Sequence, residues 1–287
     1  MRPSIRGCGM DDRAWRVLRR HRSATAGFAI LALFVALSIA VPWVSPHDPG
    51  AQNADVSLQA PSISNWFGTD RFGRDIFTRV WLGGRLSLWI GVLAVALSLG
   101  AGVPLGAAAG YFGGRTDWLI SRLIEIMLAL PSILLALMIA AAFRGGTNWV
   151  TVVIAVGVVG IPQFARQVRA GVIEIRERDF VTAARALGAS PLSVLARHVL
   201  PNTLGTIIVL STMRLAIAIL DAAALSFLGL GVETGTAEWG AMLHDGREIF
   251  RQAPYLALFS GAAITLTVLG VNLFGDGLRD ALDPRSR

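Results

Sequence analysis

The chain has 287 residues, of which 54% are hydrophobic, and its mean hydropathy is +0.58. This balance is more apolar than that of most soluble domains. All 26 basic residues are arginine, which excludes a P-loop, because that phosphate-binding loop needs a lysine on the β- and γ-phosphates. The net charge of +7 is explained by arginines that orient apolar blocks in a membrane, so we expect no nucleic-acid partner.

Six apolar blocks can be tested as transmembrane helices, which need about 20 residues to cross a bilayer. They run from Ala24 to Val44, Leu86 to Gly110, about Leu123 to Phe143, Trp149 to Phe164, about Leu204 to Leu230 and Tyr255 to Phe274. The fourth block is short, and the fifth contains Arg214 and Asp221. The sequence therefore predicts an all-α integral membrane protein with six transmembrane helices.

The arginines are unequally divided between the two sides of these spans. Seventeen lie on the side of both termini and seven on the other. Short cytoplasmic loops keep arginine whereas translocated loops lose it, so we predict that both termini face the cytoplasm. The first block also resembles a signal peptide with a cleavage site at Ser38-Ile39-Ala40, but an uncleaved first span is needed for this distribution. The lone Cys8 has no partner in the chain for a disulfide.

The external segment between the first two spans changes character along its length. Prolines predict irregular structure in its first part. Further on, Asp70 and Asp75 stand beside Arg71, Arg74 and Arg79. Exposed ion pairs contribute only about 0 to 1 kcal/mol each, so we expect a solvated segment that leads into a helix.

Glycine and proline mark particular places in the spans. Gly102, Gly106 and Gly110 recur every four residues, which clears one helix face for close packing, although glycine is also simply tolerated in membrane helices. Pro104 and Pro131 are expected to kink the second and third spans.

The cytoplasmic stretch from Ala165 to Asn202 is long for a mere connection, and long ordered loops are often functional. Its residues from Asp179 to Leu187 suit a helix, and Gly188 suits the left-handed position that follows one. Ser190-Pro191 then supplies a helix start, and that second helix is expected to stop before Pro201.

This predicted hairpin has a slim first helix. Ala183, Ala184 and Gly188 are small, and Phe180 and Leu187 flank them. Such a face can lie in a groove of another protein. The alternative is a surface hairpin that rests on its own helices.

The hairpin resembles the cytoplasmic loop motif of the permease subunits of binding-protein-dependent ABC importers, which reads E-A-A, three residues, G, nine residues, I-x-L-P. Thr182 replaces the usual acid and His198 the usual isoleucine, so an ion pair made by that acid cannot be assumed here. The resemblance implies a contact with an ATPase through residues that match the motif or replace its acid, which are Thr182, Ala183, Ala184, Gly188, Leu200 and Pro201.

Three further segments resemble the C-type permease of the dipeptide, oligopeptide and nickel branch. They are Phe67 to Asp70 with Gly73-Arg74-Asp75, Leu225 to Gly231 with Trp239-Gly240, and the region from Asn272 to Arg285. Relatives usually carry prolines between Glu233 and Glu238, so this external loop is expected to differ in shape.

Arg214 and Asp221 lie seven residues apart on one helix face, and intramembrane charges commonly mark a solute pathway or a proton relay. Two helical turns separate them by about 10 Å, so we expect neighbouring helices or a wet channel, rather than each other, as their surroundings. We take them as candidate channel-lining residues. A proton-coupled secondary transporter is the competing interpretation.

No catalytic, cofactor-binding or metal-binding residue is predicted. Asp276, Asp280 and Asp283 cluster near Arg279 and could suggest the metal site of an intramembrane enzyme. They follow the last span, however, and are interpreted as a solvated end with local arginine pairing. The four histidines lack zinc-ligand spacing.

The sequence thus predicts a permease subunit of the bacterial inner membrane that performs no chemistry itself. Residues 1–23 form a cytoplasmic tail, 24–85 the first span and external segment, and 86–287 the permease core, with the coupling hairpin at 165–202. By resemblance it pairs with a similar permease, two ATPase subunits and an external solute-binding protein. Di- or oligopeptides are the expected solutes, and nickel or another small solute is the alternative.

The isolated chain is expected neither to bind nor to hydrolyse ATP, because it has no lysine with which to build a P-loop. Equilibrium binding of ATP to the purified subunit is the measurement, and stoichiometric binding would contradict this expectation.

Overall fold

The computed structural model describes residues 21–143, 148–233 and 235–282, and these ranges contain no β-strand. The helical elements are α2 (Arg22–Val44), η1 (Ala54–Val56), α3 (Ile76–Phe112), α4 (Gly114–Ala129), α5 (Ser132–Ala142), α6 (Trp149–Arg176), α7 (Asp179–Ala186), α8 (Pro191–Val194), η2 (Leu195–Val199), α9 (Leu200–Phe227), α10 (Trp239–Glu248) and α11 (Pro254–Leu282). The predicted all-α fold is confirmed for the part of the chain that is described.

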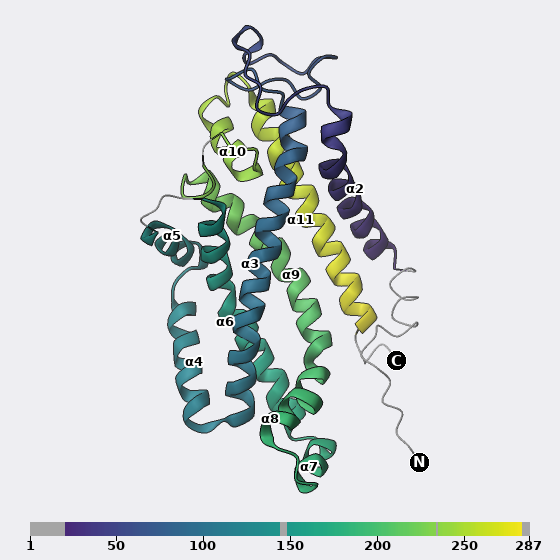
Figure 1. Ribbon diagram of the computed structural model, residues 1–287, viewed down its shortest axis with the longest axis vertical. Coiled ribbons are helices and arrows are strands. Elements are labelled where there is room, and N and C mark those ends of the chain that lie inside the picture. The colour runs from purple at the N-terminus through teal and green to yellow at the C-terminus, as the bar shows by residue number, and fades with distance from the viewer. Residues whose placement is uncertain (1–20, 144–147, 234, 283–287) are drawn as a thin grey trace.

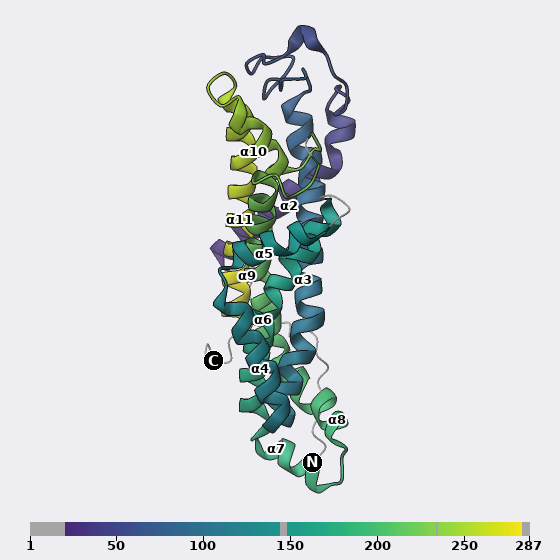
Figure 2. The same cartoon turned by 90° about the vertical axis from the view of Figure 1, so that its left-hand side faces the viewer.

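Long helices lie side by side and form the body of the molecule (Figure 1). The segment before α3 and the short helix α10 lie at one end, which we call the cap end, and α7 and α8 lie at the other, the hairpin end (Figures 1 and 2). Within the described ranges, five helical runs are long and apolar enough to cross a membrane: α2, α3, α6, the run from Pro191 to Phe227, and α11. Counting the bent pair α4 and α5 as one broken span gives the six predicted spans.

The third span is broken where a kink was predicted. Helices α4 and α5 are bent by 95° relative to each other at Leu130-Pro131. The residue before a proline avoids the helical region, and Leu130 accordingly has an extended ψ of 138°. Helix α3, in contrast, runs through Pro104 without interruption.

Several helices extend beyond the apolar blocks that predicted them. Helix α3 begins at Ile76 rather than Leu86, and α6 continues to Arg176 rather than ending at Phe164. Hydropathy marks only the part of a helix that matches the bilayer. The start of α3 is set instead by Asp75, whose carboxylate accepts a hydrogen bond from the Thr78 N–H at 2.8 Å as an N-cap.

The most extensive helix packing among the described elements joins α3 and α6. A Cβ atom added at Gly102 would lie 2.6 Å from the Phe164 Cβ, and one at Gly110 would lie 2.8 Å from the Arg169 carbonyl oxygen. Gly106, between them, is closer still, because a Cβ there would lie even nearer to the Ala165 carbonyl oxygen. The prediction that these glycines clear a face for another helix is confirmed.

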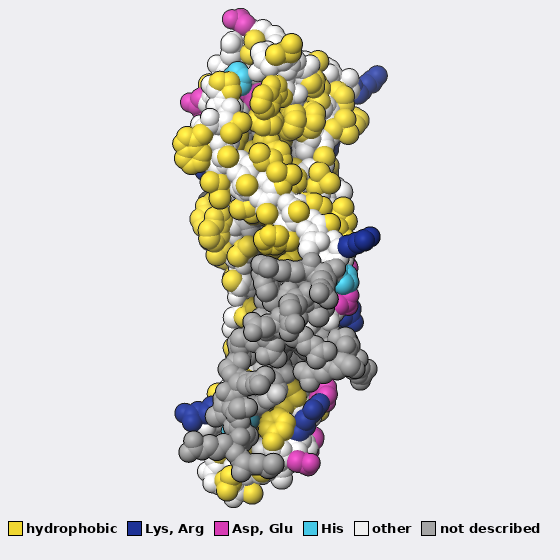
Figure 3. Space-filling model, turned by 90° about the vertical axis from the view of Figure 1, so that its right-hand side faces the viewer, with side chains coloured by type: hydrophobic (Ala, Val, Ile, Leu, Met, Phe, Trp, Pro, Cys, Tyr) yellow, Lys and Arg dark blue, Asp and Glu magenta, His cyan; other side chains and the backbone are white. Residues whose placement is uncertain are grey.

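The surface around α2 is apolar. Figure 3 shows hydrophobic side chains over much of this side of the molecule. Phe28, Leu33 and Trp43 of α2 are 61%, 55% and 79% exposed. A soluble protein rarely leaves such a large apolar surface in water, whereas the same surface suits contact with lipid.

Replacing Gly106 by valine is expected to destabilise the protein by about 1 to 3 kcal/mol, because the added side chain overpacks the α3–α6 contact. Gly100 is the matched control, since it lies on the same helix and a Cβ there meets no atom within 4 Å. Thermal unfolding in detergent should show a lower midpoint for Gly106→Val than for Gly100→Val. Equal midpoints would contradict the packing argument.

Candidate functional site

The hairpin forms at the predicted place and ends its first helix as expected. Gly188 follows α7 with a φ of +84°. Its N–H donates to the Arg185 carbonyl at 2.9 Å, and the Ala189 N–H donates to the Ala184 carbonyl at 3.2 Å. These two bonds are the Schellman arrangement, in which a left-handed glycine ends a helix. Ser190 then caps α8.

Helix α7 is attached along one side only. Val181 is its one fully buried residue, and it packs in an apolar cluster with side chains of α6 and the helices that follow the hairpin. Ala184 is half-buried, whereas Thr182 and Ala183 are exposed and Leu187 is 88% exposed. The hairpin therefore rests on its own helices through one side and leaves an apolar outer face uncovered.

The helix after the hairpin does not stop before Pro201, so that prediction was wrong. Helix α8 continues through η2, a π-helical turn, directly into α9. A proline ring crowds the turn before it, and a wider π turn just ahead of Pro201 relieves this crowding. Leu200 is half-buried against the apolar cluster of the hairpin, and Pro201 is exposed at the start of α9. These two residues form the joint between hairpin and span rather than part of the α7 surface.

Two arginines fasten the helices at the hairpin end. Arg169 of α6 makes a bidentate ion pair with Asp117 of α4, at 2.5 and 2.6 Å. Arg176 donates to the Gly110 carbonyl at 2.7 Å and so satisfies a carbonyl in the last turn of α3. The hairpin consequently projects from a firmly joined base.

The two intramembrane charges lie on α9. Arg214 is 3% exposed and Asp221 is half-buried. Within the described residues, the Arg214 Nε and the Asp221 Oδ2 are buried without a hydrogen-bond partner. A Cβ added at Gly160 would lie 3.1 Å from the Arg214 Nη2, so the guanidinium reaches α6.

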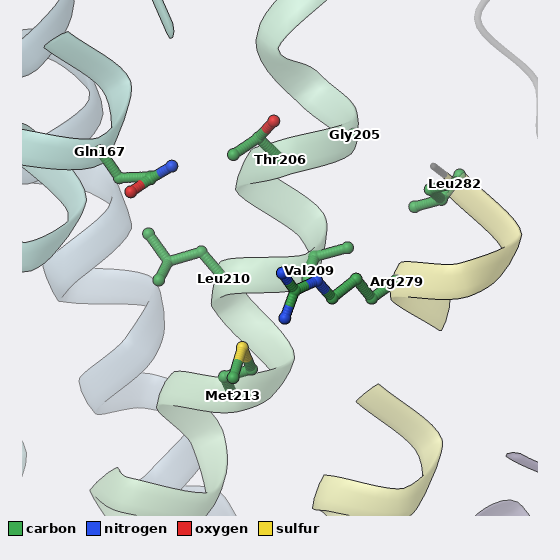
Figure 4. Close-up of a pocket in the computed structure, with 8 residues that line it drawn as sticks. All are labelled: Gln167, Gly205, Thr206, Val209, Leu210, Met213, Arg279 and Leu282. Atoms are coloured by element: carbon green, nitrogen blue, oxygen red, sulfur yellow. The ribbon is translucent and has the colours of Figure 1, made fainter. Parts of the chain in front are cut away.

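A cavity of about 410 Å³ opens between α6, α9 and α11 (Figure 4). It extends along α9 from Gly205 to Met213, which directly precedes Arg214. Gln167 faces it from α6, and Arg279 reaches toward α9 from α11 (Figure 4). The cavity therefore has polar groups on its walls and leads along α9 toward the buried charge.

The segment expected to be solvated contains a buried charge cluster instead. Asp70, Arg74 and Arg79 are 3%, 7% and 3% exposed. The Asp70 Oδ2 accepts a hydrogen bond from the Arg74 Nε at 2.7 Å and lies 3.8 Å from the Arg79 Nε. Both arginines also donate to the Gly235 carbonyl, at 3.0 and 2.8 Å. The local pairing was predicted, but the prediction that it is exposed to solvent was wrong, because a distant loop covers the cluster.

Helix α10 was missed by the sequence analysis. Glu238 caps it, accepting hydrogen bonds from the Gly240 and Ala241 N–H groups at 3.0 and 2.8 Å. The same carboxylate accepts from the Ser87 hydroxyl of α3 at 2.9 Å, and the Trp239 indole donates to a backbone carbonyl of α3 at 2.8 Å. The available signal was the acid directly before the Trp-Gly pair, since Asp and Glu favour a helix N-terminus.

Arg71 joins the cap segment to α10. Its guanidinium lies 3.0 Å from the Glu248 carboxylate and 3.8 Å from that of Asp245. Asp245 is 5% exposed, and burial raises the pKa of its carboxyl, against the opposing effect of Arg71 and other nearby cations. Charged contacts thus join the cap segment and α10 into one layer.

Among the described residues of the acidic end, neither Asp276 nor Asp280 forms an ion pair with Arg279. Asp280 lies 3.1 Å from His21 instead, Asp276 is exposed, and Asp283 lies outside the described residues. The described ranges hold no group of three or more His, Cys, Asp or Glu side chains suited to a metal ion.

Residues 102–287 match the family model for the "Binding-protein-dependent transport system inner membrane component". The chain belongs to this family. Residues 12–61 match the model for the "N-terminal TM domain of oligopeptide transport permease C". The protein is therefore a permease subunit of a bacterial binding-protein-dependent ABC importer, located in the inner membrane, and the predicted resemblance is confirmed. Membership implies ATPase and binding-protein partners, and it overturns the alternative of a proton-coupled secondary transporter.

The permease is similar to characterised relatives along nearly its whole length. It is 46% identical over 274 residues to the dipeptide transport system permease protein DppC of Alkalihalophilus pseudofirmus, covering 96% of this chain and 90% of that protein. It is 44% identical over 274 residues to the glutathione transport system permease protein GsiD of Escherichia coli, covering 94% and 89%. An inward-facing structure of the MetNI methionine ABC transporter aligns with a TM-score of 0.59 at 19% identity, over 71% of this chain and 96% of that chain, and shows a shared fold.

Proposed function

We propose that this permease subunit carries di- or oligopeptides across the inner membrane. The observation that carries the proposal is the 46% identity to a dipeptide permease across 96% of the chain. The relative named for glutathione supports it independently, because glutathione is also a small peptide. Arg214 and Asp221 line the solute pathway in this proposal, since they are charged groups in a span and retain buried polar atoms without partners among the described residues.

The outer face of α7 docks on an ATPase subunit in this proposal. Thr182 and Ala183 present little bulk there, and the exposed Leu187 offers an apolar anchor. Ala184 and Gly188 shape the end of the helix, while Leu200 and Pro201 form the joint to α9. Because Val181 is buried against the helices that follow the hairpin, a displacement of α7 by ATP binding would reach α9.

The complete importer would contain a second, similar permease, two ATPase subunits and an external solute-binding protein. Both termini and the hairpin face the cytoplasm, and the cap end faces the binding protein. This orientation follows from the arginine distribution. The chain then divides into a cytoplasmic tail at 1–23, a first span with its external segment at 24–85, and a permease core at 86–287. ATP binding and hydrolysis in the partners would rock the spans between outward and inward access.

Replacing Gly188 by valine is expected to abolish coupling while leaving the complex assembled. The residue has a φ of +84°, and a left-handed position strains a residue with a Cβ by about 1 kcal/mol or more. Uptake of a dipeptide into proteoliposomes that contain the whole importer should fall, and so should stimulation of ATPase activity by the loaded binding protein.

Gly114 provides the matched control for this experiment. It also has a positive φ, of +54°, and like Gly188 it has open space around the position of a Cβ, but it is the first residue of α4, away from the hairpin. Gly114→Val should carry similar backbone strain and retain uptake. Wild-type uptake and stimulation in Gly188→Val would show that the hairpin is not the coupling element, and equal losses in both variants would show that strain alone is responsible.

A further inference from the structure

Helix α9 presents a cation and an anion on one face. Seven residues return an α-helix to within about 20° of the same direction, so Arg214 and Asp221 project from nearly the same side. No ion pair joins them within the described ranges, and each retains a buried polar atom without a hydrogen-bond partner there. A buried polar atom without a hydrogen-bond partner costs free energy, especially on a charged group. Both side chains can therefore bind a further hydrogen-bonding partner.

Exposed apolar side chains lie beside these charges on α9. Met213, Ile217 and Leu220 lie on the adjoining face of α9 and are 41%, 42% and 46% exposed. The cavity of Figure 4 runs along the same helix from the hairpin end, and Leu210 on its wall is one turn before Arg214. The exposed side chains of Met213, Ile217 and Leu220, the cavity and the two partly unsatisfied charges thus all lie along α9.

We propose that Arg214 and Asp221 bind the two charged ends of a short peptide in transit. Arg214 takes the C-terminal carboxylate, because a guanidinium matches a carboxylate in charge and geometry, and Asp221 takes the N-terminal ammonium. This inference rests on the proposed peptide transport. It adds a solute class, namely zwitterionic peptides with both termini free. It also adds a direction, in which the carboxylate of the peptide points toward the hairpin end.

The spacing of the two charges fits a short solute. They are separated by about 10 Å along the helix axis, which is the reach of roughly three extended residues. Two single contacts favour entry of the solute but still allow its release, as a transport pathway requires.

Two photoreactive tripeptides test the direction directly. One carries photoleucine at its first position and the other at its last, with alanine elsewhere and both termini free. The whole importer is loaded with each probe by its binding protein, trapped with vanadate and irradiated, and the labelled residues are mapped by mass spectrometry. We expect the C-terminal probe to label residues around Arg214 and the N-terminal probe to label residues around Asp221.

Variants test whether the charges are the cause. Arg214→Gln should reduce labelling by the C-terminal probe and lower uptake about tenfold, the loss expected for about 1.4 kcal/mol of binding, and Arg214→Lys should recover part of both. Arg122→Gln is the control, because Arg122 is an exposed cation of α4 that pairs with Glu125 at 3.3 Å. It should leave labelling and uptake unchanged.

The outcomes separate the inference from the proposed function. If the wild-type importer takes up neither tripeptide, peptide transport is wrong and this inference falls with it. If it takes up both but the labels are reversed, or lie away from α9, only the inference is overturned. Unchanged labelling in Arg214→Gln would also overturn the inference. Loss of complex assembly in that variant would overturn it too, because it would assign Arg214 to contacts between subunits.

Discussion

Every polar backbone group inside a bilayer must find its partner within the protein, and the arrangement of α2 against α3 shows how this chain meets that requirement. Pro42 of α2 has no N–H to donate to the Ser38 carbonyl, four residues earlier. Arg85 of α3 supplies the missing donor, because its Nε lies 2.6 Å from the Ser38 carbonyl oxygen and its Nη2 lies 2.9 Å from that of Ile39. One guanidinium thus satisfies the proline-interrupted helix and fastens it to its neighbour.

Arginine contacts fasten helices at both ends of the molecule, but the outermost segment is held differently at each end. At the cap end, Arg74 and Arg79 share the Gly235 carbonyl and Arg71 contacts α10, so distant segments are held by several charged contacts. At the hairpin end, α7 is held mainly by the buried Val181. In the proposed orientation, the firmly joined cap would receive the loaded binding protein and the lightly attached hairpin would be moved by the ATPases.

Much of this architecture was readable from the sequence because the signals were local. Apolar blocks located the spans, and Gly188 with Ser190-Pro191 located the hairpin turn. Proline was read less well: Pro131 breaks its span as expected, but a π turn lets the helix pass through Pro201, which was expected to end it. Which outcome occurs depends on the packing around each proline.

The cap was not readable for a different reason. The arginines that pair with Asp70 also donate to the carbonyl of Gly235, a residue far away in the chain, and no periodicity or motif connects the two segments. The candidate functional site was likewise predictable only in part. The hairpin residues were predicted in place, but the cavity beside Arg214 is built from α6, α9 and α11 together and became visible only in the fold.

The central claim is that the cap faces outward and the hairpin faces the ATPases inside. Two exposed positions allow a direct measurement, Ile63 in the cap segment, 97% exposed, and Leu187 at the hairpin, 88% exposed. Each is replaced by cysteine in a Cys8→Ser background and treated in intact cells with a maleimide that cannot cross the inner membrane. The account predicts labelling of Ile63→Cys in intact cells and of Leu187→Cys only after the membrane is opened; the reverse pattern would contradict it.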